Sequence, residues 1–119
     1  MKKTIALIAA VTAITSVVSA QLLTWTPDFA KDNDNITITV DATKGNQGLL
    51  NYTPTSDVYV HIGVITNLST SPTNWLYAPF TWGTTPPAAQ ATSLGNNKWQ
   101  YSINNIRNFF GVPAGETIL

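Results

Sequence analysis

The chain contains 119 residues, of which only six are basic and six acidic, and it has one histidine and no cysteine. The lack of cysteine excludes disulfide bonds and thiolate zinc sites. The sparse and balanced charge argues against nucleic acid or an anionic membrane as a partner, because both require clustered Lys and Arg.

The first twenty residues are typical of a secretory signal peptide. Lys2 and Lys3 give a basic start, Ile5–Val18 is mostly apolar, and Val18-Ser19-Ala20 offers small residues for cleavage. We therefore predict a signal peptide over residues 1–20 and a mature chain that is secreted, periplasmic or at the cell surface. An uncleaved membrane anchor is the alternative, but the apolar stretch is shorter than the ~20 residues of a membrane span.

Residues 21–119 form one predicted domain. They hold four basic and six acidic side chains, and so carry a net charge of −2. A chain of this length buries roughly two-thirds of its unfolded surface, which suffices for one core. No internal repeat or linker divides it.

Two strands are expected before the first long loop. Leu22–Trp25 is short, and Pro27 ends it. Asn35–Ala42 alternates between apolar and polar residues, which indicates a half-buried strand. A polar turn over 28–35 joins the two, and the Gly, Asn and Pro residues of 44–54 predict a loop.

The longest patterned stretch is Asp57–Gly83. Its first part alternates, with Val58, Val60, Ile62 and Val64 on one face and Tyr59, His61, Gly63 and Ile65 on the other. A polar turn over 67–74 leads to a second part that contains Trp75, Tyr77, Phe80 and Trp82. We predict a hairpin whose exposed face is the candidate recognition surface.

The remaining segments predict a second hairpin and a short helix. Ala89–Leu94 and Lys98–Ile103 flank a Gly-Asn-Asn turn. Asn104–Gly111 has apolar residues at helical spacing, with an Asn to cap its start and a Gly to close its end. Glu116–Leu119 begins a strand whose apolar end would leave an unpaired edge, so we expect the sequence to be truncated before its last strands.

Strands at intervals of about ten residues, without βαβ alternation, predict an all-β antiparallel sandwich. The segments DVYVHIGVIT (57–66), NW (74–75), FTWG (80–83), SLGNNKW (93–99) and IRNFFGVPAGETIL (106–119) carry a family resemblance. They resemble an N-terminal immunoglobulin-like module of secreted proteins of the Bacteroidetes type, often alpha-amylase-like glycosidases or sorted proteins. The chain is more loosely similar to starch-binding modules of family 25/26. The resemblance covers Thr24–Leu119 and implies an immunoglobulin-like sandwich followed by a further domain of the same polypeptide.

A catalytic role is disfavoured. His61 is the only histidine, and Asp57, the nearest carboxylate in sequence, is about 13 Å away along an extended strand. No Gly-x-Ser-x-Gly elbow and no glycosidase pair of carboxylates is present. Asp28, Asp32 and Asp34 cluster in one loop but lack the Gly and the closing Glu of a calcium loop, so turn formation is the preferred interpretation. We expect neither an enzyme, nor a metal site, nor a cofactor.

The aromatic residues allow two interpretations. Sugar rings stack their C–H faces on Trp and Tyr, and their hydroxyls need polar side chains nearby. Trp75, Tyr77, Trp82 and Trp99, with His61, Asn74 and Gln100, could supply both kinds of group. Our candidate binding residues are Trp75, Tyr77, His61 and Asn74, because Trp75 and Tyr77 would stand on one strand face about 6.6 Å apart. Trp82 has the opposite parity and is the candidate core ring.

Two functions follow from these interpretations. The first is a non-catalytic carbohydrate-binding module, for α-glucan, within a larger secreted glycosidase. The alternative is a structural immunoglobulin-like spacer that binds no ligand, in which the aromatic residues serve core and hairpin packing.

Overall fold

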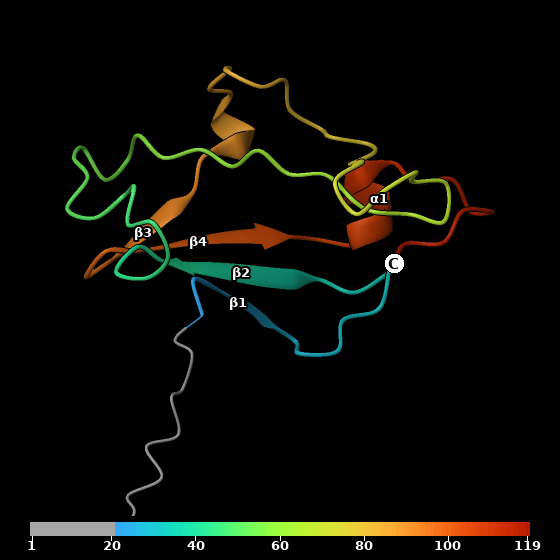
Figure 1. The fold of residues 1–119 in the computed structure, drawn as a ribbon, viewed down its shortest axis with the longest axis horizontal. Coiled ribbons are helices and arrows are strands. Elements are labelled where there is room, and N and C mark those ends of the chain that lie inside the picture. The colour runs from blue at the N-terminus through green and yellow to red at the C-terminus, as the bar shows by residue number, and fades with distance from the viewer. Residues whose placement is uncertain (1–20) are drawn as a thin grey trace, which may run out of the picture.

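The structure is a computed structural model that describes residues 21–119, and the predicted signal peptide lies outside the described residues (Figure 1). Its regular strands form one four-stranded antiparallel sheet in the order β1-β2-β4-β3. The strands are β1 (Leu23–Thr26), β2 (Ile36–Asp41), β3 (Thr92–Gly95) and β4 (Lys98–Ile103). A 3-10 turn, η1 (Pro87–Ala89), and a five-residue helix, α1 (Ile106–Phe110), complete the regular elements. The predicted all-β antiparallel class is confirmed.

The sheet register places the apolar residues of β2 on one face together with those of its neighbours. Ile38 pairs with Trp25 on one side and with Tyr101 on the other. Val40 likewise lies between Leu23 and Trp99. Because directly paired residues point to the same side of a sheet, these side chains form one apolar face.

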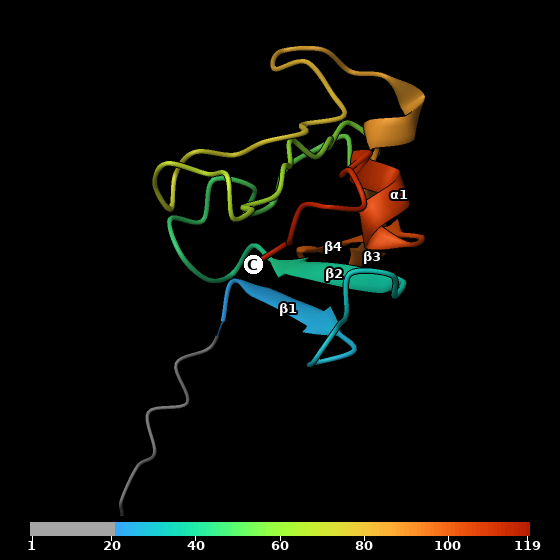
Figure 2. The same ribbon diagram turned by 90° about the vertical axis from the view of Figure 1, so that its right-hand side faces the viewer.

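A second layer lies over this face, and the segment Val58–Thr66 runs through the middle of it (Figures 1 and 2). The backbone of this segment changes partner along its length. Val58 and Val60 bond with residues 89–91, Val64 exchanges two hydrogen bonds with Leu76, and Thr66 forms a bridge with Ile118. The predicted hairpin between 57 and 83 is therefore wrong as a regular ladder, because no single partner segment stays alongside long enough. Of the face predicted to carry Val58, Val60, Ile62 and Val64, the two outer residues Val58 and Val64 are buried, and Val60 and Ile62 are half-buried.

The core has two parts, one at each end of the sheet. One consists of Ala42, Val58, Ala91 and Trp99, and the other of Val64, Ile103, Phe110 and Val112. Trp99 is the core ring, with 2% of its surface exposed and its indole Nε1 donating to the carbonyl of Thr55 at 2.9 Å. The prediction that Trp82 is the core ring is wrong, because its side chain is 78% exposed.

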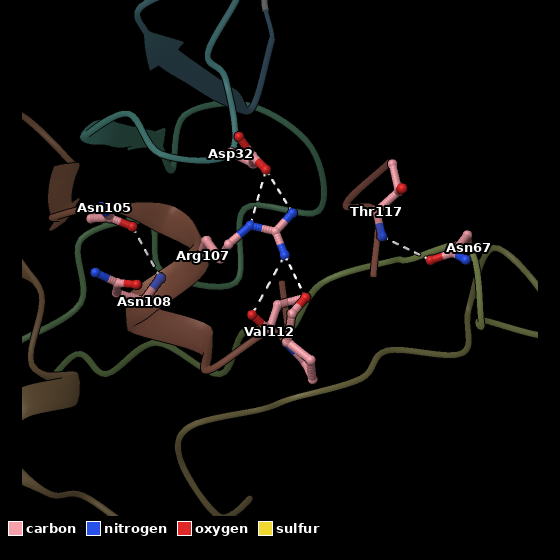
Figure 3. A network of polar contacts seen from close by, with 8 residues as sticks. Asp32, Asn67, Asn105, Arg107, Asn108, Val112 and Thr117 are labelled. Carbon is pink, nitrogen blue, oxygen red and sulfur yellow. Dashed lines mark hydrogen bonds and ion pairs between the residues drawn. The ribbon is translucent and has the colours of Figure 1, made fainter. Parts of the chain in front are cut away.

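Helix α1 closes one end of the molecule much as its sequence predicts. The side chain of Asn105 accepts a hydrogen bond from the backbone N–H of Asn108, and Gly111 ends the helix in a left-handed conformation with φ 68°. Arg107 ties the helix to the loop before β2 through Asp32 (Figure 3). No helix within residues 21–119 is long and apolar enough to span a bilayer.

Candidate functional site: an exposed aromatic cluster

The side chain of His61 lies between two exposed tryptophans. Its ring centroid is 6.1 Å from that of Trp75 and 5.0 Å from that of Trp82, the latter in an edge-to-face arrangement. Trp75 is 53% exposed and Trp82 is 78% exposed. We call these three residues the aromatic cluster. It joins a group able to form hydrogen bonds to two large apolar ring faces that remain open to solvent.

The position of Trp75 depends on Gly63, which lies beside it on the neighbouring segment. A Cβ atom at Gly63 would stand 3.0 Å from the Cβ of Trp75 and 3.1 Å from the carbonyl oxygen of Leu76. Contacts this short are tighter than nearly all real Cβ contacts, so a side chain at position 63 would require the Trp75 segment to shift by a few tenths of an ångström. Two backbone hydrogen bonds between Val64 and Leu76, of 2.8 and 3.0 Å, hold the same two segments together.

Tyr77 departs from the geometry that the sequence predicts. Its φ is 56°, in the left-handed region, so the two-residue alternation of a regular strand does not hold between it and Trp75. The predicted placement of these two rings on one strand face, about 6.6 Å apart, is therefore not supported. The Tyr77 hydroxyl instead donates a hydrogen bond to Oε2 of Glu116.

Glu116 links this aromatic segment to the interior. Its residue is only 6% exposed, and its other carboxylate oxygen accepts a hydrogen bond from the hydroxyl of Thr66, which is fully buried. The hydrogen bond to Glu116 is the main cause that raises the pKa of Tyr77, followed by burial and by the carboxylate charge. The sequence predicts Glu116 only as the start of a strand, and its position there gives no signal of burial.

The two other polar candidates have different surroundings. Oδ1 of Asn74 already accepts a hydrogen bond from the backbone N–H of Thr70 at 3.0 Å, so that oxygen closes the polar turn. Gln100 lies on β4 between Thr39 and Thr92, and it lines the same cavity as His61 and Trp75. Of the four predicted binding residues, the structure thus brings His61 and Trp75 into contact, gives Tyr77 a separate partner and leaves Asn74 in the turn.

One ring nitrogen of His61 is chemically unusual. Nδ1 is buried and has no hydrogen-bond partner among residues 21–119. A buried polar atom without a partner costs about 1–3 kcal/mol, and a functional role is one of the explanations for such an atom in a folded domain. Because Nδ1 is buried, a ligand on the outer face of the cluster could form a hydrogen bond only with the other ring nitrogen, Nε2.

An apolar cavity lies beneath the cluster. Its volume is about 420 Å³, and it lies between the sheet and the Val58–Gly63 part of the second layer, with His61 and Trp75 in its wall. The other lining side chains are mostly apolar residues of β2, β4 and the second layer, among them Ile38, Val40, Val60 and Ile62. A cavity of this chemistry cannot satisfy the many hydroxyls of a sugar, so we place the candidate site on the outer face of the cluster.

The acidic residues of the loop before β2 do not form a metal site in the described part of the chain. Within 21–119 there is no group of three or more His, Cys, Asp or Glu side chains that could hold a metal ion. In the loop before β2, Asp32 pairs with Arg107, and Asp34 accepts a hydrogen bond from the backbone N–H of Lys31 at 2.8 Å. The Asp34 contact shapes the turn, and the Asp32 contact joins the loop to helix α1.

The class of protein that the fold and site define is an all-β domain with an exposed aromatic cluster. The chain matches no protein-family model, and no curated protein or solved structure is significantly similar to it.

Proposed function

We propose that the chain is a non-catalytic carbohydrate-binding module, exported from the cell and serving as an accessory domain of a larger secreted glycosidase. The observation that carries the proposal is the aromatic cluster, in which Trp75 and Trp82 flank His61 and keep 53% and 78% of their surfaces exposed. Two tryptophans left open to water in one place are costly for a domain that binds nothing. Sugar rings satisfy both parts of such a surface, since their C–H faces cover the indoles and their hydroxyls reach the histidine.

The choice of α-glucan and of an immunoglobulin-like arrangement follows from the family resemblance of the sequence. The four-stranded antiparallel sheet with a second layer above it is compatible with that arrangement. Export follows from the basic and apolar start of the chain. Amino-terminal sequencing of the secreted protein should begin at Gln21, and a secreted protein that retains Met1 would contradict cleavage.

The proposal is tested by affinity electrophoresis in gels with and without soluble starch. The parent protein should be retarded by starch, and Trp75→Ala and Trp82→Ala should each weaken retardation by roughly tenfold or more, as tryptophans at the centre of an interface do. The matched control is Trp25→Ala. Trp25 is also exposed, at 47%, but it lies on β1 and takes part in neither of the two ring pairs of the aromatic cluster.

The outcomes separate the two functions. Retardation that is lost in both cluster variants and kept in Trp25→Ala supports carbohydrate binding. If the parent migrates identically with starch, with other polysaccharides and without any, the binding proposal fails and the structural spacer is the remaining function.

A further inference from the structure

The backbone of Tyr77 needs an external support. A φ of 56° is disfavoured for a residue with a bulky side chain, and such a conformation persists only where its surroundings enforce it. Within residues 21–119, the one hydrogen bond made by the Tyr77 side chain is the bond to Glu116. This bond is therefore the candidate support for the strained conformation.

Glu116 is well suited to hold another residue in place. Both of its carboxylate oxygens are engaged, one by Tyr77 and the other by the buried hydroxyl of Thr66. Backbone pairing secures the segment that follows, because Asn67 donates to the carbonyl of Thr117 at 3.0 Å and Leu119 donates to that of Ile65 at 2.9 Å. The side-chain oxygen Oδ1 of Asn67 accepts a hydrogen bond from the backbone N–H of Thr117 at 2.8 Å (Figure 3).

The support reaches the aromatic cluster through a short piece of backbone. Trp75 and Tyr77 are separated only by Leu76, which is fixed by its pair of hydrogen bonds with Val64. The segment that presents Trp75 is thus held at Leu76 by the backbone and at Tyr77 by Glu116. If the hydrogen bond to Glu116 were lost, Tyr77 would relax toward ordinary φ values. The residues on either side of Tyr77, including Trp75, would then be displaced.

We infer that Glu116 is a positioning residue of the aromatic cluster, which holds the Trp75–Tyr77 segment in its binding conformation through the Tyr77 hydroxyl without touching the ligand. The inference rests on the proposed carbohydrate-binding function for its effect on affinity. Its structural part, the control of Tyr77 by Glu116, stands independently of any ligand.

Four variants of the full mature chain test it. Tyr77→Phe removes only the hydroxyl, Glu116→Ala removes the carboxylate, and Glu116→Gln keeps one oxygen that can accept a hydroxyl hydrogen bond. The matched control is Tyr52→Phe, because the hydroxyl of Tyr52 also donates to a carboxylate, that of Asp57 at 3.2 Å, but outside the cluster.

Starch retardation is the first readout. Tyr77→Phe and Glu116→Ala should weaken it by roughly tenfold, about the factor by which a left-handed conformation is disfavoured for a residue with a side chain. Glu116→Gln should recover part of the loss, and Tyr52→Phe should bind like the parent. A folded Tyr77→Phe variant that is retarded as strongly as the parent overturns the inference, whether or not Glu116→Ala folds.

The second readout needs no ligand. The phenol of Tyr77 is titrated by ultraviolet difference spectra, assigned by comparing the parent with Tyr77→Phe, and the backbone coupling constant of residue 77 is measured by NMR. Because Glu116 raises the pKa of Tyr77, Glu116→Ala should lower this pKa toward the ordinary tyrosine value. The backbone coupling constant of residue 77 should also move away from the value of a left-handed conformation. An unchanged coupling and titration in Glu116→Ala contradict the inference. If the parent does not bind starch, the proposed function fails, and this readout still decides the role of Glu116.

Discussion

Arg107 donates hydrogen bonds from both Nε and Nη2 to one carboxylate oxygen of Asp32, at 3.0 and 2.6 Å (Figure 3). Its third nitrogen, Nη1, donates to the carbonyl of Pro113 at 2.7 Å. A single guanidinium therefore joins three segments: the loop before β2, helix α1 and the chain that follows the helix. The side chain of Arg107 is 16% exposed, so these bonds are partly shielded from water.

Replacing Arg107 should destabilise the domain. We expect Arg107→Ala to lower the free energy of unfolding by about 2 kcal/mol, because hydrogen bonds to charged groups contribute about 1.5–3 kcal/mol and the partner Asp32 is partly screened by solvent. Arg107→Lys should lower the free energy of unfolding by about half as much, since an ammonium group cannot place several N–H donors in one plane as the guanidinium does. Urea denaturation measures both changes.

The control for this prediction is Lys31→Ala. Lys31 is an exposed cation in the same loop and makes no ion pair within residues 21–119, so its loss should change stability by less than about 0.5 kcal/mol. Equal losses of stability in Lys31→Ala and Arg107→Ala would mean that the loss of a positive charge, and not the loss of the Arg107 hydrogen bonds, accounts for the effect.

The elements that the sequence predicted well are those decided by neighbouring residues. Strand β2 follows from the alternation of Ile36, Ile38 and Val40 with threonines, and the capped helix α1 follows from Asn105 and Gly111. The turn between β3 and β4 also agrees, because Asn96 and Asn97 adopt the positive φ values that such a hairpin needs. In each of these elements, local conformational preference and burial favour the same structure.

The predictions that are wrong or incomplete concern residues whose burial is decided by contacts with distant parts of the sequence. Strand parity placed Trp82 in the core, but parity requires a continuous strand, and no strand runs through the proline-containing segment 79–87. The burial of Glu116 depends on Thr66 and Tyr77, which are 50 and 39 residues away in sequence. No local pattern carries such information, so the place of Trp82 in the aromatic cluster and the contacts of Glu116 became visible only in the fold.

Gly63→Ala should displace the segment that carries Trp75 and so disturb the aromatic cluster. The added methyl group would meet the Cβ of Trp75 at 3.0 Å and the carbonyl of Leu76 at 3.1 Å, and neither atom belongs to a flexible side-chain end. We expect a loss of about 1–3 kcal/mol of stability, the usual cost of overpacking, together with weaker starch retardation. Thermal melts and affinity electrophoresis measure the two effects.

A second glycine provides the comparison for Gly63. The Cβ of Gly48→Ala would meet only Oδ1 of Asn46, at an ordinary 3.6 Å, so this variant should melt like the parent or slightly higher. Should Gly63→Ala also melt and bind like the parent, the close approach of the Trp75 segment would not be a feature of the protein in solution.

The stability of the domain should fall in acid partly through Asp41. Its carboxylate accepts hydrogen bonds from the hydroxyl and the backbone N–H of Thr43, at 2.6 and 3.0 Å, and these bonds hold the pKa of Asp41 below its ordinary value. A carboxyl whose pKa is lower in the folded state stabilises the fold above its unfolded pKa, and this contribution is lost as the pH falls through the folded pKa. Thr43→Val should raise the pKa of Asp41 and flatten the dependence of the urea midpoint on pH between about pH 5 and pH 2. NMR titration of the Asp41 carboxyl carbon checks the shift, and Thr92→Val, on the exposed strand β3, should leave it unchanged.

The clearest test of the fold itself compares the two tryptophans whose positions differ most. Trp99 is 2% exposed and packs with Ala42, Val58 and Ala91, whereas Trp82 is 78% exposed. Trp99→Ala should cost about 3–5 kcal/mol of stability, because it leaves a large cavity and also removes the indole bond to the carbonyl of Thr55. Trp82→Ala should cost less than about 1 kcal/mol, as surface substitutions do. Urea denaturation of both variants measures the difference, and acrylamide should quench the fluorescence of the Trp99→Ala variant more completely than that of Trp82→Ala, provided that both are folded. Equal destabilisation by the two substitutions would show that the core is not built around Trp99.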